Sequence, residues 1–162
     1  MIFKLGESII DIDVEKTREF YRTANIITDG CTCDGCRNYV KATQYFPKNV
    51  QELFDEWGID LNKAAEIWAI CGFDNGKVLL YGGFYHVCGK LLTDTDVWCA
   101  KQNDKINTLK KREKSLMYEI EKNYSIGFTE DCDLLEENFP APVIQLEIDF
   151  CVPWVLKEKN NY

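Results

Sequence analysis

Three cysteines lie within six residues, in the segment CTCDGC that begins at Cys31. Cysteine thiolates bind Zn²⁺ tetrahedrally at about 2.3 Å, and a pair separated by two residues, such as Cys33 and Cys36, lets one turn present both sulfurs to one metal. Gly35 favours such a turn because glycine adopts backbone conformations that other residues avoid. Cys31 adds a third sulfur. The segment therefore predicts two or three of the four ligands of a zinc site.

The only histidine of the chain stands in the segment GGFYHVCG, two residues before a further cysteine. On a strand these two side chains point to the same face, because strand residues alternate with a period of two. We expect them to supply the second ligand pair. The four ligands of the predicted zinc site come from five candidates: Cys31, Cys33, Cys36, His86 and Cys88. Four protein ligands leave no position for water, so such a site is structural.

Two other interpretations of these residues stay open. Free cysteine is among the most buried residue types, so the thiols can be core residues and His86 a hydrogen-bonded core histidine. Cys33 and Cys36 can also form a redox pair, because a helix N-terminus lowers the pKa of a thiol. A thioredoxin-type pair normally follows a core strand of a βαβ unit, whereas here helices precede a predicted hairpin. The ligand spacing favours metal over both alternatives.

The chain is acidic, with 19 basic and 27 acidic side chains and a formal net charge of −8. This charge disfavours direct binding of nucleic acid and favours a basic protein surface as the partner. Residues 123–150 hold several carboxylates and no lysine or arginine. Such a run contacts a cationic partner or serves solubility alone. The residues that we predict to bind the partner are Glu130, Asp131, Asp133, Glu136 and Glu137.

The sequence contains no nucleophile motif, P-loop or dinucleotide-binding fingerprint. Paired carboxylates can act as acid and base, but charged runs are usually solvated faces. We therefore predict a protein without enzymatic activity. No apolar run approaches the roughly 20 residues that span a membrane, and the first residues do not resemble a secretory signal, so a cytoplasmic location is expected.

Periodicity predicts the elements that must position these residues. Apolar residues at spacings of three and four predict three helices, at residues 14–24, 36–46 and 47–57. A period of two predicts strands at residues 67–73, 77–91 and 144–150, with a further strand indicated at 124–128.

Two glycine-containing pairs mark special backbone positions. Asn75 and Gly76 are typical of a type I′ hairpin turn, and Gly82 with Gly83 indicates a bulge or the close approach of another backbone. The charged stretch from Lys101 to Lys122 suits a helix or a hairpin. We predict one domain over residues 1–162 with an α+β fold, in which N-terminal helices pack on an antiparallel sheet around one structural zinc site.

Five segments carry a resemblance to a known group of proteins. They are DVEKTREFY from Asp13, CTCDGCRNYVKA from Cys31, WGIDLNKAAEIW from Trp57, YGGFYHVCG from Tyr81 and VIQLEIDFCVPWVL from Val143. Together they resemble a family of short cysteine-motif proteins of Gram-positive bacteria and their prophages. The resemblance implies a phage or mobile-element context, in which small acidic proteins disable host defence enzymes. Anti-CRISPR proteins are one such group, and some of them bind metal.

The functional hypothesis combines these inferences. We expect a zinc-stabilised binding protein that inhibits a host nucleic-acid-handling enzyme, such as a CRISPR effector nuclease, by occupying its basic surface. The alternatives are a thiol redox enzyme, a zinc-dependent enzyme with an open metal position, and an immunity protein that neutralises a toxin.

Overall fold

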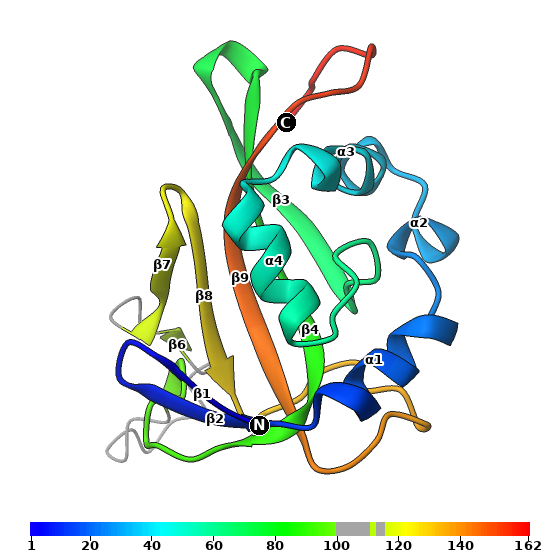
Figure 1. Ribbon diagram of the computed structural model, residues 1–162. Coiled ribbons are helices and arrows are strands. Elements are labelled where there is room, and N and C mark those ends of the chain that lie inside the picture. Colours follow the sequence, from blue (N-terminus) through cyan, green and yellow to red (C-terminus); the bar gives the residue numbers. More distant parts are fainter. Residues whose placement is uncertain (100–110, 113–115) are drawn as a thin grey trace, which may run out of the picture.

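The computed structural model describes residues 1–99, 111–112 and 116–162, and it has the predicted α+β architecture, with helices packed on an antiparallel sheet (Figure 1). The helices are α1 (Val14–Thr23), α2 (Ile27–Gly30), α3 (Asp34–Ala42) and α4 (Lys48–Glu56), with 3-10 turns η1 (Thr43–Tyr45) and η2 (Asp74–Gly76). The strands are β1 (Ile2–Leu5), β2 (Ser8–Ile12), β3 (Glu66–Phe73), β4 (Val78–Leu91), β5 (Trp98–Cys99), β6 (Lys111–Arg112), β7 (Tyr118–Glu121), β8 (Tyr124–Thr129) and β9 (Val143–Pro153).

The long strand β4 organises the sheet. The strand order is β1-β2-β4-β9-β8-β7, and β3 also pairs with β4. One edge of β4 pairs with β9, while the other edge is shared: β3 pairs with it as far as Phe84, and β2 pairs with it from Gly89 onward. The four residues between these two points therefore have one edge without a neighbouring strand.

Helix α1 completes this open edge. The Tyr21 hydroxyl donates to the His86 carbonyl at 3.0 Å and accepts from the His86 amide at 3.3 Å. The Thr17 hydroxyl accepts from the Cys88 amide at 3.1 Å, and the Cys88 carbonyl accepts from the Asp13 amide at 2.7 Å. Buried backbone groups need partners, so these bonds fix α1 to β4 at one place and in one orientation.

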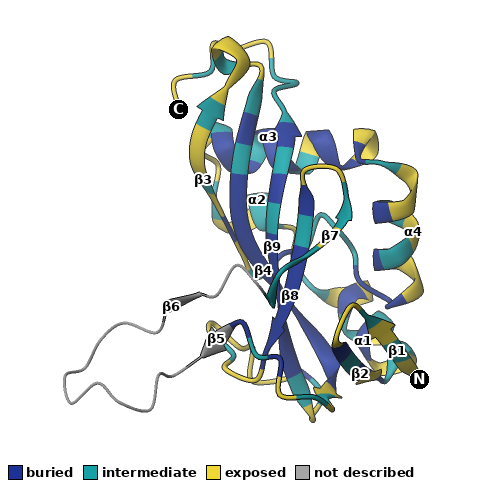
Figure 2. Cartoon of the chain, turned by 90° about the vertical axis from the view of Figure 1, so that its left-hand side faces the viewer, coloured by how far each residue is buried: buried dark blue, intermediate teal, exposed yellow. Residues whose placement is uncertain are grey.

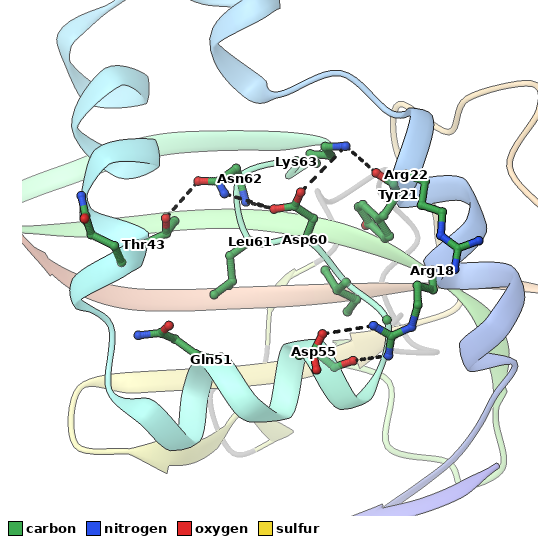
Figure 3. Close-up of a pocket in the computed structure, with 13 residues that line it drawn as sticks. Arg18, Tyr21, Arg22, Thr43, Gln51, Asp55, Asp60, Leu61, Asn62 and Lys63 are labelled. Carbon is green, nitrogen blue, oxygen red and sulfur yellow. Dashed lines mark hydrogen bonds and ion pairs between the residues drawn. The ribbon is translucent and has the colours of Figure 1, made fainter.

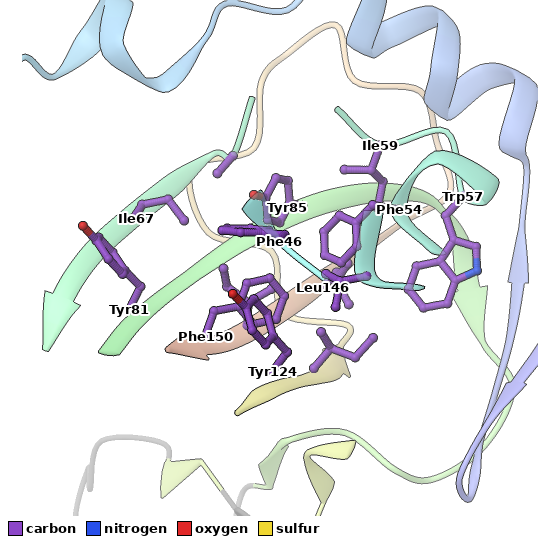
Figure 4. Close-up of a cluster of buried hydrophobic side chains, with 14 of the residues drawn as sticks. Phe46, Phe54, Trp57, Ile59, Ile67, Tyr81, Tyr85, Tyr124, Leu146 and Phe150 are labelled. Carbon is purple, nitrogen blue, oxygen red and sulfur yellow. The ribbon is translucent and has the colours of Figure 1, made fainter. Parts of the chain in front are cut away.

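An aromatic core joins α3 and α4 to the sheet, and Figure 4 shows side chains of this core from α4 and the strands. Tyr39 of α3 packs edge-on against Tyr81 of β4, with ring centroids 5.3 Å apart, and Phe54 of α4 packs against Phe150 of β9 at 6.0 Å. Trp57, at the end of α4, is also buried. Burial of one such side chain contributes about 1.5–3 kcal/mol, so this cluster holds the helices on one face of the sheet. Buried residues follow β4, β8 and β9, whereas β3 is mostly exposed (Figure 2).

The three predicted helices are confirmed with small shifts of their ends. The first is α1 and the third is α4. The second begins two residues earlier than predicted, at Asp34, because Cys33 is its N-cap, and its last part is the 3-10 turn η1. The prediction missed the hairpin of β1 and β2 and the single turn α2, which are all very short.

The four predicted strands are confirmed as β3, β4, β8 and β9, but the expected alternation along β3 is only partly right. The bulge that the glycine pair indicated lies in β3 and not in β4, where the register shifts between Ala69 and Cys71. Beyond this shift, Cys71 and Phe73 are exposed. The glycine pair of β4 instead allows residues of β3 to approach the β4 backbone closely. A Cβ atom on Gly82 would lie 2.6 Å from the Trp68 ring across the strands, which only glycine avoids.

The predicted hairpin turn has the expected backbone but a longer loop. Asn75 and Gly76 have positive φ angles of 55° and 81°. However, Phe73 pairs with Val78, so the loop has four residues rather than two, and Asp74 also has a positive φ of 48°.

The stretch 101–122, for which helix and hairpin stayed open, lies largely outside the described residues. Its described parts include two strands: β6, which pairs antiparallel with β5, and β7, which pairs antiparallel with β8.

Candidate metal centre

The thiols of Cys31, Cys33 and Cys36 converge in front of α3, where their sulfur atoms all lie within 4.8 Å of one another. The Cys31 and Cys33 sulfurs are 3.3 Å apart, and none of the three cysteines forms a disulfide. Sulfurs bound to a tetrahedral zinc at about 2.3 Å lie about 3.8 Å from one another. The observed spacing therefore needs only small side-chain adjustments to hold a metal ion.

The N-terminus of α3 positions these thiols. Cys33 is the N-cap residue, and its sulfur accepts from the Cys36 amide at 3.5 Å. Cys36 lies in the first turn and is buried, whereas Cys33 is exposed. The Gly35 carbonyl accepts from the Tyr81 hydroxyl at 2.9 Å, which anchors the turn to β4. The C-x-x-C spacing thus places an exposed thiol, Cys33, and a buried thiol, Cys36, on the same helical turn.

The C-terminal tail covers this turn. The Tyr162 hydroxyl accepts from the Gly35 amide at 3.0 Å, and a Cβ atom on Gly35 would lie 2.9 Å from that hydroxyl. Arg37 of α3 forms an ion pair with Glu158 at 2.6 Å. Sequence reasoning missed this contact, since nothing in the tail marks it as a neighbour of a loop more than 120 residues away.

The surroundings of Cys33 and Cys36 shift the pKa values of their thiols in opposite directions. Burial by itself raises the pKa of Cys33, but hydrogen bonds from the Cys36 amide and from the side chains of Cys31, Cys36 and Tyr162 bring it down to about 7. Burial raises the pKa of Cys36, and hydrogen bonding with its two neighbouring thiols raises it further. At neutral pH the exposed thiol of Cys33 is therefore partly ionised, whereas the buried thiol of Cys36 is protonated.

The structure does not bring His86 and Cys88 to this cluster, so the predicted second half of the metal site is corrected. The β4 residue that contacts the cysteine turn is Tyr81. His86 lies five residues further along, about 17 Å at the usual rise of a strand, and on the opposite face because five is an odd number. Cys88 is more distant still along the strand. The HVC triplet instead marks the part of β4 whose open edge is completed by α1.

His86 is a buried core histidine under the acidic loop. Its side chain packs against Phe139, with ring centroids 5.6 Å apart, and it is 3% exposed. Burial lowers its pKa, and hydrogen bonding with the Asp133 backbone and the Gln145 side chain partly offsets that effect. The burial matches the alternative of a core histidine, but within the described residues its Nε2 atom has no hydrogen-bond partner.

The five acidic residues predicted to bind a partner lie in the loop between β8 and β9, and all are exposed: Glu130, Asp131, Asp133, Glu136 and Glu137. The loop is held at its base, where the Glu130 amide donates to Asp96 at 2.9 Å and the Asp133 amide donates to Gln145 at 2.8 Å. Among the described side chains, no lysine or arginine forms an ion pair with Glu130, Asp133, Glu136 or Glu137.

Comparisons of the chain with protein-family models, curated proteins and solved structures found no match. The resemblance to phage-associated proteins therefore stays a prediction. Within the described residues, no helix is long and apolar enough to cross a membrane.

Proposed function

We propose that the chain is a zinc-binding protein whose Cys31, Cys33 and Cys36 thiolates hold the ion in front of α3. The observation that supports this most is the convergence of the three sulfurs within 4.8 Å without a disulfide. Thiolates are preferred ligands of zinc, and tetrahedral coordination requires one further group. Among the described residues, the Tyr162 hydroxyl lies against the same turn and is a candidate for that position, with water as the alternative.

Elemental analysis tests this proposal. Protein produced with added zinc and purified without chelators should carry about one zinc ion per chain. Cys33→Ser and Cys36→Ser should lose it. The matched control is Cys132→Ser, which alters a half-buried cysteine in the loop between β8 and β9 and should retain the metal. Wild-type protein without metal, or equal loss in all three variants, would contradict the site.

We further propose that the protein acts by binding another protein and not by catalysis. In this proposal the loop from Glu130 to Glu137 occupies the basic nucleic-acid-binding surface of a host defence enzyme, in the manner of an anti-CRISPR protein. Its support is the exposure of the loop carboxylates on a chain of net charge −8. Complementary charge accelerates association and makes it sensitive to salt.

The test begins with affinity capture from a host lysate and identification of the retained protein. Changing all five loop carboxylates to lysine should then slow association with that partner and reverse its salt dependence. A control with the same charge change elsewhere uses five exposed carboxylates: Glu7, Glu52, Glu56, Glu66 and Asp74. If the control slows association as much as the loop variant does, the loop is only a solubilising surface. Capture of a toxin instead of a defence enzyme would favour the immunity protein.

A thiol redox function is the second candidate, because an exposed thiol with a pKa of about 7 stands next to a buried one. In such a function the Cys33 thiolate attacks a substrate disulfide and releases one thiol, and Cys36 then attacks Cys33 and releases the second. Titration of metal-free protein against glutathione distinguishes a redox function from zinc binding. A reversible disulfide between Cys33 and Cys36 with a potential near those of cellular redox proteins would favour this candidate over zinc.

A further inference from the structure

An open cavity of about 530 Å³ lies between α1, α4 and the loop that follows Trp57 (Figure 3), and no cysteine lines it. Its volume lies within the range of about 300–1,000 Å³ that is typical of small-molecule sites. Buried Tyr21 and Ile59 supply apolar surface to its lining. Polar and charged side chains make up most of the remaining lining and offer hydrogen bonds to a ligand.

The charges around the cavity favour an anion. Arg18 and Arg22 of α1 and Lys63 of the loop line it, against the two carboxylates of Asp55 and Asp60. The two arginines are four residues apart, so they lie on one face of the helix and repel each other. Asp55 pairs with Arg18 at 3.1 Å, but among the described side chains no carboxylate pairs with Arg22. An excess of positive charge at one place on an acidic protein indicates an anionic ligand.

Two of these cations are held in place before any ligand arrives. Arg18 donates to the Asp55 carboxylate at 3.1 Å and to the Asp55 backbone carbonyl at 2.7 Å. The Lys63 ammonium donates to the Tyr21 carbonyl at 2.5 Å and lies 3.8 Å from Asp60. Groups that are already ordered lose less conformational entropy when a ligand binds.

The other end of the cavity offers hydrogen-bond acceptors. The side-chain amide nitrogen of Gln51 donates to the Phe46 carbonyl at 2.7 Å, and that of Gln44 donates to the Lys41 carbonyl at 2.9 Å. These bonds leave the Oε1 atoms of both glutamines as acceptors for hydroxyl or amine groups of a ligand. The cavity therefore combines cations of α1 and of the loop that follows α4 with the acceptor atoms of Gln44 in η1 and Gln51 in α4.

We propose that this cavity binds a small hydroxylated metabolite that carries a phosphate or carboxylate group. Arg22 and Arg18 contact the anionic group, and Gln44 and Gln51 accept from the hydroxyl groups. The proposal uses no residue of the metal centre or of the acidic loop, so it holds or fails independently of the proposed function.

Titration of the full-length protein with three probes tests the proposal: ribose 5-phosphate, gluconate and ribose. In ¹H–¹⁵N spectra, at least one of the two anionic probes should shift the amides of residues 58–63 at millimolar concentration, and ribose should shift them far less. Arg22→Gln should weaken binding about tenfold or more, because it removes a charge-assisted hydrogen bond. Arg22 is exposed, so the variant should fold normally.

The matched control is Lys16→Gln, which removes the same charge from the same helix outside the cavity and should leave binding unchanged. Three results would overturn the proposal: no shift with either anionic probe, equal binding of ribose, or equal weakening by the Arg22 and Lys16 variants. The last result would mean that binding follows net charge and not this cavity.

Discussion

At Cys33, the N-cap position of α3 exposes a thiol whose pKa is lowered to about 7 by hydrogen bonds that outweigh its partial burial. About half of this thiol is ionised at pH 7, and the thiolate is the form that reacts. In metal-free protein we expect iodoacetamide to modify Cys33 before every other described cysteine, with a rate that rises through a midpoint near pH 7. Peptide mass spectrometry at a series of pH values measures this. Faster modification of Cys71, which is also exposed, would contradict it.

Tyr162 contributes to this acidity from the other end of the chain. Its hydroxyl is one of the hydrogen-bonding groups that lower the pKa of Cys33. Tyr162→Phe keeps the ring and removes that bond, so the midpoint of Cys33 alkylation should move upward from about 7. Tyr45→Phe, an exposed position in η1, provides the control and should not change the midpoint. An unchanged midpoint in the Tyr162 variant would mean that the tail does not reach the thiol in solution.

Among the elements, α1 takes the place of a strand along part of β4. Tyr21→Phe would leave the His86 amide and carbonyl without their partner while keeping the aromatic packing. An unpaired buried group costs about 1–3 kcal/mol, so the free energy of unfolding in urea should fall by about that amount. Tyr45→Phe again serves as the control. A loss no larger than in the control would show that water satisfies this edge of β4.

The acidic loop covers His86, whose side chain is buried in the folded protein. Burial lowers the pKa of His86 below its usual value of 6.5, so the unfolded chain takes up a proton at a higher pH than the folded one. The contribution of His86 to stability is therefore constant above pH 6.5 and is lost as the pH falls below it. From about pH 7 to pH 5 the free energy of unfolding should fall more for the wild type than for His86→Gln. Both proteins have the same carboxylates, so the difference reports on His86. Parallel stability curves for the two proteins would contradict this.

At the scale of the whole molecule, the cysteine turn and the tail that covers it lie beside the aromatic core and not within it. We therefore expect zinc to stabilise the protein without being required for its fold. Removal of zinc with a chelator should preserve the far-ultraviolet circular dichroism spectrum. Hydrogen exchange should accelerate in the first turn of α3 and in residues 154–162, and remain slow in β4 and β9. Complete loss of structure on chelation would instead make the metal an obligatory part of the fold.

The local features of this protein follow from its sequence because they depend on neighbours along the chain. The helical and strand periods predict α1, α4, β4 and β9, and the spacing within CTCDGC brings three sulfurs together over one turn. Contacts between distant segments depend on how the strands pair, which the sequence pattern does not specify. The pairing of β4 with its neighbours decides that Tyr81, and not His86, contacts the cysteine turn. Likewise, only the folded chain brings Tyr162 to Gly35 and Lys63 to Tyr21, because contacts between distant segments leave no periodic signal in the sequence.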